Sequence, residues 1–427
     1  MGKQIKYRLV LMYWLQFAIW GSYLTSMGGY LGSIGLGQNI GWFYSVQGIV
    51  SIFTPALFGI IADRWVPAQK LLGFSHLIAA SLMLYVGYTG ITHGDAVQFA
   101  DIFPPYVASV AFYMPTLALA NSLSYTVLSN NGLDTVKEFP SIRIFGTIGF
   151  IVAMWIVDLV GIQHNAYQFI ACAAWGFCLG IYSFTMPNCP VSAGDKKASA
   201  AESFGLKAFA LFKSRKMLIF FIFSMLLGIS LQITNGFANP FIAEFKNDSA
   251  YADVYFANHP NILISISQMS ETLCILLIPF FLKRFGIKQI MLIAMLAWAL
   301  RFGLFSIGDP SWPGVLLLIT SMLVYGVAFD FFLISGSLFV DKETEPSIRS
   351  SAQGLFMLMT NGLGAAIGTM AAQTIVNHFV IDGAPTADRL CGWSASWEIF
   401  ACYSVVVAVL FALIFRYKKN NTDIAKG

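Results

Sequence analysis

The sequence predicts an all-α integral membrane protein with twelve transmembrane helices in two halves of six. Three observations predict this fold class: the composition, the number of long apolar runs and the positions of Lys and Arg. Of the 427 residues, 57% are hydrophobic and 11% are charged, and the mean hydropathy is +0.70. Soluble domains are about half apolar and about a quarter charged. Most of this surface must therefore face lipid, which excludes an ordinary soluble enzyme, a disordered chain and a nucleic-acid binder.

Twelve stretches are apolar for long enough to cross a bilayer, which takes about 20 mainly apolar residues in a helix. They cover approximately residues 9–30, 41–62, 70–90, 103–127, 141–161, 166–187, 217–243, 261–282, 286–307, 312–336, 350–377 and 394–415. Internal residues such as Pro115 and Gly326 are compatible with spans, because neighbouring helices satisfy the freed backbone groups. The first run lacks a small-residue cleavage pattern, so it predicts a membrane helix rather than a cleaved signal.

The positions of Lys and Arg predict the orientation. Only Lys246 and Arg389 fall in outer segments when the N-terminus is placed inside, and Arg143 and Arg301 fall inside spans. Lys70 and Lys288 stand at the inner ends of their spans and count as inner residues. The remaining basic residues then lie in inner segments, as the positive-inside rule requires. A wrong number of spans would scramble this asymmetry, so it supports twelve helices with both termini in the cytoplasm.

An internal repeat relates the two halves. The residues Pro140–Arg143 recur as Pro346–Arg349, each after a charged inner loop and at the start of a glycine-bearing span. The long polar stretch 188–216 predicts a cytoplasmic loop between an N-terminal bundle, residues 1–187, and a C-terminal bundle, residues 217–427. Parallel repeats of six helices are the arrangement of major facilitator transporters, whose substrate binds near the bilayer midplane. We therefore expect two pseudo-symmetric bundles with a central site between them.

Asp330 is the sharpest functional candidate among the charged residues predicted inside the membrane. An ionisable side chain at a helix centre costs at least about 2.5–3.5 kcal/mol, so it needs a partner, a cavity or a function. Asp330 follows Tyr325 and Phe329, which are four residues apart and share a helix face. A carboxylate beside aromatic rings suits a sugar-like or base-like ligand with hydroxyls. The alternative is a structural Asp that pairs with a buried Arg.

Two polar stripes lie in other spans. Gln268 and Glu271 are three residues apart in the eighth span, and Ser267 lengthens their stripe. Gln232 and Asn235 repeat the spacing in the seventh span. Amides both donate and accept hydrogen bonds, which suits a neutral polar solute. Interhelical hydrogen bonding is the alternative role for both stripes.

Two arginines fall inside predicted spans. Arg143, near the inner end of the fifth span, is followed by Thr147 and Phe150. It is either a ligand contact or a basic anchor at the helix end. Arg301 lies deeper, in the ninth span, and lacks polar sequence neighbours, so we interpret it as a structural ion-pair partner. His76 lies near a predicted span end and is interpreted as structural.

The chain lacks the signatures of common enzyme chemistry. No P-loop pattern indicates ATP as the driver, and neither H-E-x-x-H nor G-x-S-x-G occurs. The six cysteines form no C-x-x-C pair, which argues against a disulfide framework or a zinc site. We interpret them as buried thiols, except for Cys391 in a predicted outer loop. We therefore expect no enzyme activity, no metal and no cofactor.

Several motifs together resemble the nucleoside:proton symporter family of the major facilitator superfamily. The resemblance extends over almost the whole chain, from about Leu9 to Tyr417. The motifs that carry it are Leu15–Ser22, Phe139–Phe150, Phe223–Asn235, Ser265–Leu273, Val324–Phe332 and Ser351–Phe356. Departures from the family pattern lie mainly in the outer loops and in the central loop.

The resemblance implies a nucleoside site and import driven by protons as the coupling ion. The implied site consists of Arg143, Thr147, Phe150, Gln232, Asn235, Gln268, Glu271, Tyr325, Phe329 and Asp330. Either Glu271 or Asp330 would carry the proton, with Asp330 favoured, because a carboxyl shielded from water prefers its neutral form. We expect a multi-pass protein of the bacterial cytoplasmic (inner) membrane that functions as a monomer. Its partners would be a nucleoside, protons and membrane lipid, but no nucleic acid.

Three alternatives stay open at this point. A sugar:proton symporter of the same superfamily is the nearest one, because aromatic rings and amides also bind sugars. A drug exporter is the second. The third, a non-transporting membrane receptor or enzyme, is disfavoured because no predicted loop is large enough for a catalytic or signalling domain.

Overall fold

The computed structural model describes residues 2–189, 191, 206–345 and 348–417, and all regular secondary structure within them is helical. The chain divides into two compact units, residues 1–199 and 200–427. Most of the predicted central loop lies outside the described residues, as do Pro346 and Ser347 of the second repeat copy.

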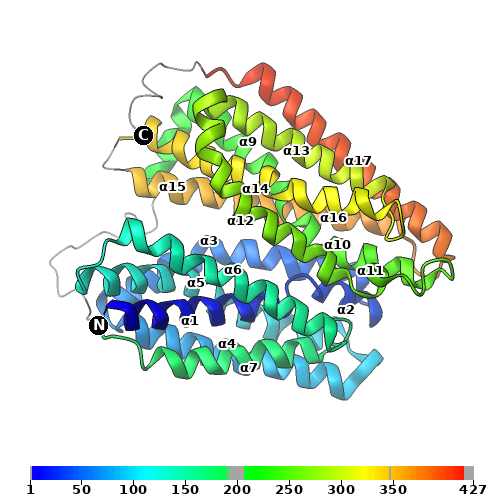
Figure 1. The fold of residues 1–427 in the computed structure, drawn as a ribbon, viewed down its shortest axis with the longest axis horizontal. Helices are drawn as coiled ribbons and strands as arrows, with labels where there is room; N and C mark the ends of the chain where they lie inside the picture. The colour runs from blue at the N-terminus through cyan, green and yellow to red at the C-terminus, as the bar shows by residue number, and fades with distance from the viewer. Residues whose placement is uncertain (1, 190, 192–205, 346–347, 418–427) are drawn as a thin grey trace. The chain divides into compact units, whose positions relative to one another are not determined.

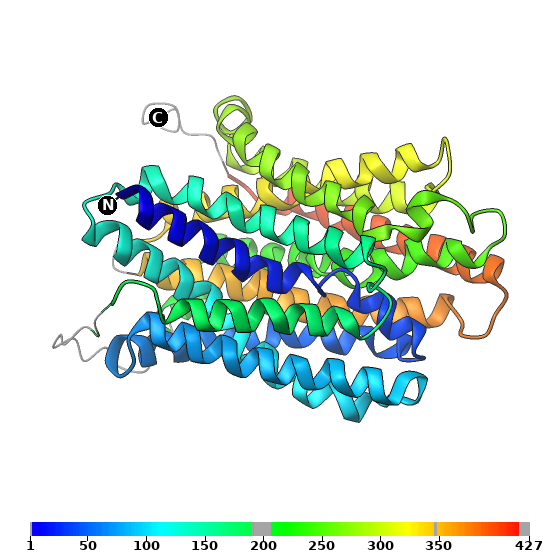
Figure 2. The same ribbon diagram turned by 60° about the horizontal axis from the view of Figure 1, so that its bottom comes forward.

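The first unit is built from long helices that run alongside one another (Figures 1 and 2). They are α1 (Gly2–Gly21), α3 (Ile40–Arg64), α4 (Ala68–His93), α5 (Phe99–Asn130), α6 (Thr135–Leu159) and α7 (Tyr167–Ser183), with the short helix α2 (Met27–Ser33) and the turns η1 (Gly37–Asn39) and η2 (Gly94–Ala96). Within this unit α1 packs against α6 and α7, and α5 packs against α3 and α4.

The second unit follows the same plan, with two of its long segments interrupted. Its elements are η3 (Leu206–Lys213), α9 (Arg215–Leu231), α10 (Ile233–Glu244), η4 (Phe245–Asn247), α11 (Tyr255–Asn258), α12 (Pro260–Phe285), α13 (Ile287–Ile307), α14 (Val315–Glu343), α15 (Arg349–Met357), the π-helical segment η5 (Leu358–Gly364), α16 (Ala365–Phe379) and α17 (Thr386–Ile414). Here α14 packs against α12 and α13, α13 also packs against α17, and α9 packs against η5 and α16.

Ten segments of the described chain are long and apolar enough to cross a membrane. Two of the twelve predicted spans, the first and the sixth, are not among them. The first corresponds to α1, which begins at Gly2 and so includes the basic residues Lys3, Lys6 and Arg8. The sixth corresponds to α7, which is 17 residues long and lies at the lower limit for a spanning helix.

Three predicted spans differ from the helices of the structure: two are interrupted and one begins earlier. The first predicted span is interrupted, because α1 ends at Gly21 and α2 begins only at Met27. The seventh is divided at Gln232, between α9 and α10. The last helix begins at Thr386 instead of residue 394, so Cys391 and Arg389 lie in α17 and not in an outer loop. Pro385 with its extended backbone stands before this helix, and Asp388 in the first turn favours an early start.

In the first unit, glycines bring α1 and α6 into backbone contact. A Cβ placed on Gly149 of α6 would lie 2.2 Å from the carbonyl oxygen of Trp14. A Cβ placed on Gly21 of α1 would lie 2.3 Å from the carbonyl oxygen of Phe150. Only glycine permits such an approach, so these two residues fix how α6 lies against α1.

The second unit has the same kind of contact between α9 and the chain that follows α15. A Cβ on Gly228 would lie 2.3 Å from the carbonyl oxygen of Thr360, and one on Gly368 would lie 2.3 Å from that of Ile229. Thr360 belongs to the π-helical segment, a feature that occurs often at functional sites. Gly228 is one turn before Gln232, so this contact lies next to the break between α9 and α10.

Candidate functional site

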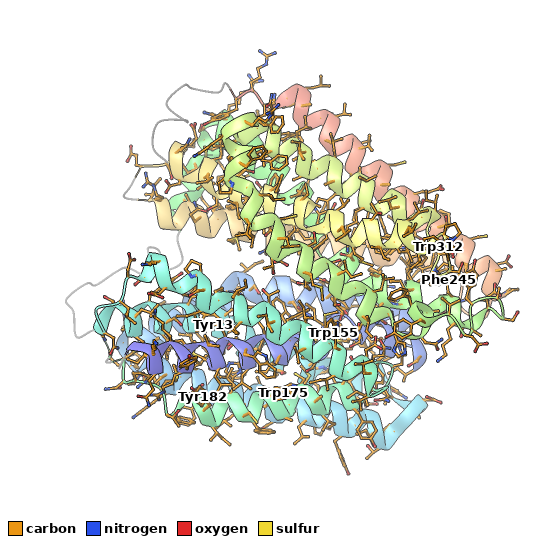
Figure 3. All side chains as sticks on the ribbon, viewed as in Figure 1. Tyr13, Trp155, Trp175, Tyr182, Phe245 and Trp312 are labelled. Carbon is orange, nitrogen blue, oxygen red and sulfur yellow. The ribbon has the colours of Figure 1, made fainter. Side chains whose placement is uncertain are left out.

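The predicted site residues of the first unit all lie on α6, and two of them, Arg143 and Phe150, contact aromatic residues of α1. The Cζ atom of Arg143 lies 4.0 Å from the ring centroid of Phe17 and 5.8 Å from that of Tyr13. Phe150 is buried and packs edge-on against Trp20, with 6.4 Å between the ring centroids. Thr147, between them, is half-buried. Figure 3 labels Tyr13, which marks the part of α1 that faces Arg143.

This arrangement holds a cation on aromatic faces. A guanidinium within about 6 Å of a ring centroid is attracted by the negative face of the ring. Tyr13 is itself fixed, because its hydroxyl donates a hydrogen bond of 2.6 Å to Oδ1 of Asn121 on α5. The sequence placed Arg143 near the inner end of its span and left its role open. The packing shows a half-buried cation with two aromatic neighbours.

His76 lies deeper than the sequence suggested. It is fully buried in α4, eight residues after the helix begins, and its Nε2 lies 2.8 Å from Oε1 of Gln16 on α1. Because that oxygen only accepts, the Nε2–H of His76 is the donor. Gln16 in turn donates to Oγ1 of Thr116, at 2.8 Å. His76 thus lies in the first third of α4, and its hydrogen bond to a neighbouring helix agrees with a structural role.

In the second unit, α14 presents a stacked aromatic pair beside a buried carboxyl. The rings of Tyr325 and Phe329 have centroids 5.5 Å apart and planes 14° apart. Trp298 of α13 packs edge-on against Tyr325 at 5.9 Å. Asp330 is 5% exposed, and its Oδ2 has no hydrogen-bond partner in the part of the chain that the structure describes. A buried acceptor without a partner is rare and costly in a finished fold.

Glu271 joins this group from α12. Tyr325 interacts electrostatically with both Glu271 and Asp330, and the two carboxyls also interact with each other. The helices meet closely here, since a Cβ on Gly326 of α14 would lie 2.6 Å from the carbonyl oxygen of Ser270 on α12. The structure therefore brings together four of the residues that the sequence selected on two separate helices.

The amides form a separate local pair. Gln232 stands at the break between α9 and α10, and its Oε1 accepts a hydrogen bond of 2.5 Å from Nδ2 of Asn235. Gln268 is half-buried on α12, three residues before Glu271. Side chains beside a helix break can reach the backbone groups that the break leaves free. The described hydrogen bonds of Gln232 and Asn235 join them to each other and not to the aromatic pair.

Arg301 belongs to the second unit's polar group, and sequence reasoning missed this. The interpretation of Arg301 as an ion-pair partner was wrong as far as the described residues show, because its hydrogen-bond partners there are neutral groups. Its Nη1 donates to the carbonyl oxygen of Ser321 at 2.6 Å, and both Nη atoms lie 3.4 Å from Oγ of Ser267. Its Cζ lies 4.7 Å from the ring centroid of Tyr325. No sequence spacing relates these partners, because they lie on two other helices.

Among the described residues, no group of three or more His, Cys, Asp and Glu side chains could hold a metal ion. All six cysteines are free. Cys172, Cys189 and Cys274 are buried, as expected. The prediction was wrong for Cys178 and Cys402, which are exposed, as is Cys391.

Comparison with known proteins gives a full-length match. A family model described as nucleoside H⁺ symporter matches residues 3–420. The xanthosine permease of Escherichia coli K12 is 45% identical, over 98% of this chain and 98% of its own. The nucleoside permease NupG of the same organism is also 45% identical, over 97% of this chain and 96% of its own. A crystal structure of a mutant of the nucleoside transporter NupG superposes with a TM-score of 0.91 at 44% identity, covering 96% of this chain and 100% of that chain.

Proposed function

We propose which side chains bind the cargo and carry the proton, starting from the nucleoside:proton symporter family, to which the chain belongs. The chain is thus a proton-coupled nucleoside importer with the major facilitator fold and not an enzyme. The proposed cargo site consists of Arg143, Thr147, Phe150, Gln232, Asn235, Gln268, Glu271, Tyr325, Phe329 and Asp330. The proton belongs to the pair Glu271 and Asp330.

One observation supports this assignment above the others: the stacked pair of Tyr325 and Phe329 stands directly beside the buried carboxyl of Asp330. A nucleoside has a flat base, which packs on aromatic faces. It also has ribose hydroxyls and base edges, which need donors and acceptors. The amides of Gln232, Asn235 and Gln268 supply both.

The coupling mechanism follows from the cost of a bare carboxylate inside a membrane. Asp330 takes up a proton from the outside, and the site binds the nucleoside while this carboxyl is neutral. The loaded carrier changes its access to the inside and releases cargo and proton. One charge crossing about 100 mV is worth about 2.3 kcal/mol. This free energy supports roughly 50-fold accumulation of a neutral nucleoside.

The family match supports a proposal for the cellular setting of the protein. The chain is a multi-pass membrane protein. We place it in the bacterial cytoplasmic membrane, with both termini in the cytoplasm and surrounded by lipid, and we expect the monomer to be functional. Protons are the coupling ion, and no other cofactor or nucleic acid takes part.

Uptake of labelled uridine into proteoliposomes tests the proposal. An inward proton gradient should drive accumulation, and a protonophore should abolish it. Asp330→Asn, which mimics the protonated acid, should still exchange uridine but should no longer respond to the gradient. Glu398→Gln, at an exposed carboxyl on α17, is the matched control and should behave like the wild type. Accumulation without a gradient would reject symport, and normal coupling in Asp330→Asn would move the proton to Glu271.

A sugar:proton symporter is separated from this proposal by competition. Excess ribose or disaccharide should leave uridine uptake unchanged, whereas unlabelled nucleosides should suppress it. Strong suppression by the sugars alone would favour the sugar alternative.

A further inference from the structure

Arg301 is a buried cation surrounded by neutral groups. It is 1% exposed, and it contacts a carbonyl oxygen, a serine hydroxyl, the sulfur of Met322 and aromatic rings. Its Nε has no hydrogen-bond partner among the described residues. A buried charge usually has an opposite charge beside it, since desolvation is otherwise uncompensated. The position therefore needs an explanation beyond packing.

The contacts of Arg301 lie one helical turn from the proposed site on both neighbouring helices. Ser267 precedes Glu271 by four residues on α12, and Ser321 precedes Tyr325 by four on α14. Four residues of α-helix rise about 6 Å. Arg301 thus hydrogen-bonds to both α12 and α14 about one turn from Glu271 on α12 and from Tyr325, near Asp330, on α14.

Tyr325 connects the cation to the acids. The guanidinium lies over its ring, and Tyr325 interacts electrostatically with Arg301, Glu271 and Asp330 alike. When both carboxyls are protonated, Arg301 is the one charged side chain among these four. When one carboxyl releases its proton, the same group becomes neutral overall.

The other titratable groups on the packed elements do not replace Arg301 in this role. Those nearest are Glu271 and Cys274 on α12, and Tyr325 and Asp330 on α14. On α17, Glu398 is exposed, and the Tyr403 hydroxyl donates to a carbonyl oxygen of α9. The ion pairs Asp341–Arg349 and Lys216–Glu343 involve the C-terminal end of α14.

We propose that Arg301 is a positioning residue for proton coupling: it holds Tyr325 in place for the cargo, and its charge stabilises the deprotonated acid in the carrier that has released proton and cargo. This inference rests on the proposed function. The charge of Arg301 matters for the return of the empty carrier, which requires a deprotonated acid. It does not matter for exchange of cargo between the two sides, in which the acid can stay protonated.

Arg301→Gln tests the role, because glutamine keeps hydrogen-bonding groups but removes the charge. In proteoliposomes we expect gradient-driven accumulation of uridine to fall about tenfold, while equilibrium exchange of labelled for unlabelled uridine continues. The acid should also hold its proton to higher pH, so the internal pH for half-maximal accumulation should shift by about one unit toward alkaline values. Lys288→Gln removes a positive charge from the same helix, at its other end, and should change neither quantity.

Arg301→Lys provides a second test of the role of the charge in case Arg301→Gln fails to fold. Lysine keeps the charge but not the paired contacts to Ser267 and Ser321, so its pH profile should match that of the wild type even where its rate is lower. A parallel loss of exchange and accumulation in Arg301→Gln would show a merely structural role and overturn the proposal. Wild-type accumulation in Arg301→Gln, or a shifted pH profile in Arg301→Lys, would also overturn it. Failure of the wild-type protein to accumulate uridine would instead reject the proposed function.

Discussion

Gly149→Ala provides a direct test of how the first unit positions the residues of the proposed cargo site. The new Cβ would lie 2.2 Å from the carbonyl oxygen of Trp14 and 2.9 Å from its Cα. Ordinary contacts of this kind begin at 3.4 Å. Backbone atoms cannot rotate away as side chains can, so α1 and α6 must move apart locally by roughly 1 Å.

The expected loss of stability follows from that displacement. Inserting a methyl group into a well-packed contact typically costs about 1–3 kcal/mol. The removal of a helical glycine returns about 0.5–1 kcal/mol, because the unfolded chain loses conformational freedom. Phe150 is the next residue, and its own carbonyl lies against Gly21. The separation of the helices should therefore also displace Phe150 and the cation that α6 carries at Arg143.

Thermal unfolding of the purified protein and uridine uptake in proteoliposomes measure the two effects. Gly149→Ala should lower the melting temperature and reduce uptake by about tenfold or more. Gly59→Ala on α3 is the control, because a Cβ there would meet no atom within 4 Å, and it should be neutral or slightly stabilising. A wild-type melting temperature together with wild-type uptake in Gly149→Ala would refute the claim that this glycine contact positions α6.

Three further predictions concern the second unit and the role of metal ions. Arg389→Gln should destabilise the protein by about 1–3 kcal/mol, because it removes two hydrogen bonds, of 3.0 and 2.7 Å, from the nearly buried carboxylate of Glu244. A double-mutant cycle with Glu244→Gln measures the coupling between the two side chains. Additive effects of the two substitutions would contradict the prediction. That carboxylate precedes Phe245, which Figure 3 labels near one end of the unit. Gly228→Ala should lower the melting temperature and weaken uridine binding, because its Cβ would meet the carbonyl oxygen of Thr360 at 2.3 Å; unchanged affinity in equilibrium binding would argue against the link to Gln232. Treatment with a strong chelator should leave gradient-driven uptake unchanged, since the described residues contain no metal-binding cluster, and a loss reversed by added metal would contradict this.

The class of fold could be predicted from sequence because hydropathy is a property of long segments. The eighth span was expected at residues 261–282, and α12 runs from Pro260 to Phe285. Its ends are marked by a proline at the first helical position and by Gly286 with a positive φ. The breaks at residues 22–26 and at Gln232 were missed, because the sequence on both sides of each is apolar. A few small polar residues, such as Ser22, Thr25 and Ser26, do not change a 20-residue average enough to end a predicted span.

The candidate site was predictable only where its members share a helix. Tyr325, Phe329 and Asp330 lie within six residues of one another, so helical spacing alone placed them together. Arg301 could not be assigned in this way, because its partners are a backbone carbonyl on α14 and a hydroxyl on α12. Contacts of that kind are set by helix packing, which the spacing of residues within one helix does not encode.

The two copies of the internal repeat lie in or lead into segments that make equivalent helix contacts, α6 with α1 and η5 with α9. The half-buried arginine of the first unit and the buried arginine of the second unit, however, do not occupy equivalent positions. The motif copy at Pro140–Arg143 belongs to α6, which packs against α1, the first helix of its unit. The other copy leads into α15 and η5, and η5 packs against α9, the first long helix of the second unit. Glycines allow backbone contact in both cases. The arginines of the two copies nevertheless differ.

Arg143 lies half-buried on aromatic rings, whereas Arg349 is 41% exposed and pairs with Asp341 at 2.9 Å. The buried cation of the second unit is instead Arg301 on α13, which has no counterpart in the motif. The second unit contains the carboxyls of Glu271 and Asp330 as well as the buried Arg301. Proton coupling should therefore respond to substitutions of these residues more than to substitutions of Arg143. Substitution of Arg143 should weaken cargo binding and leave the ratio of protons to nucleosides unchanged, which parallel measurements of proton and uridine flux would test.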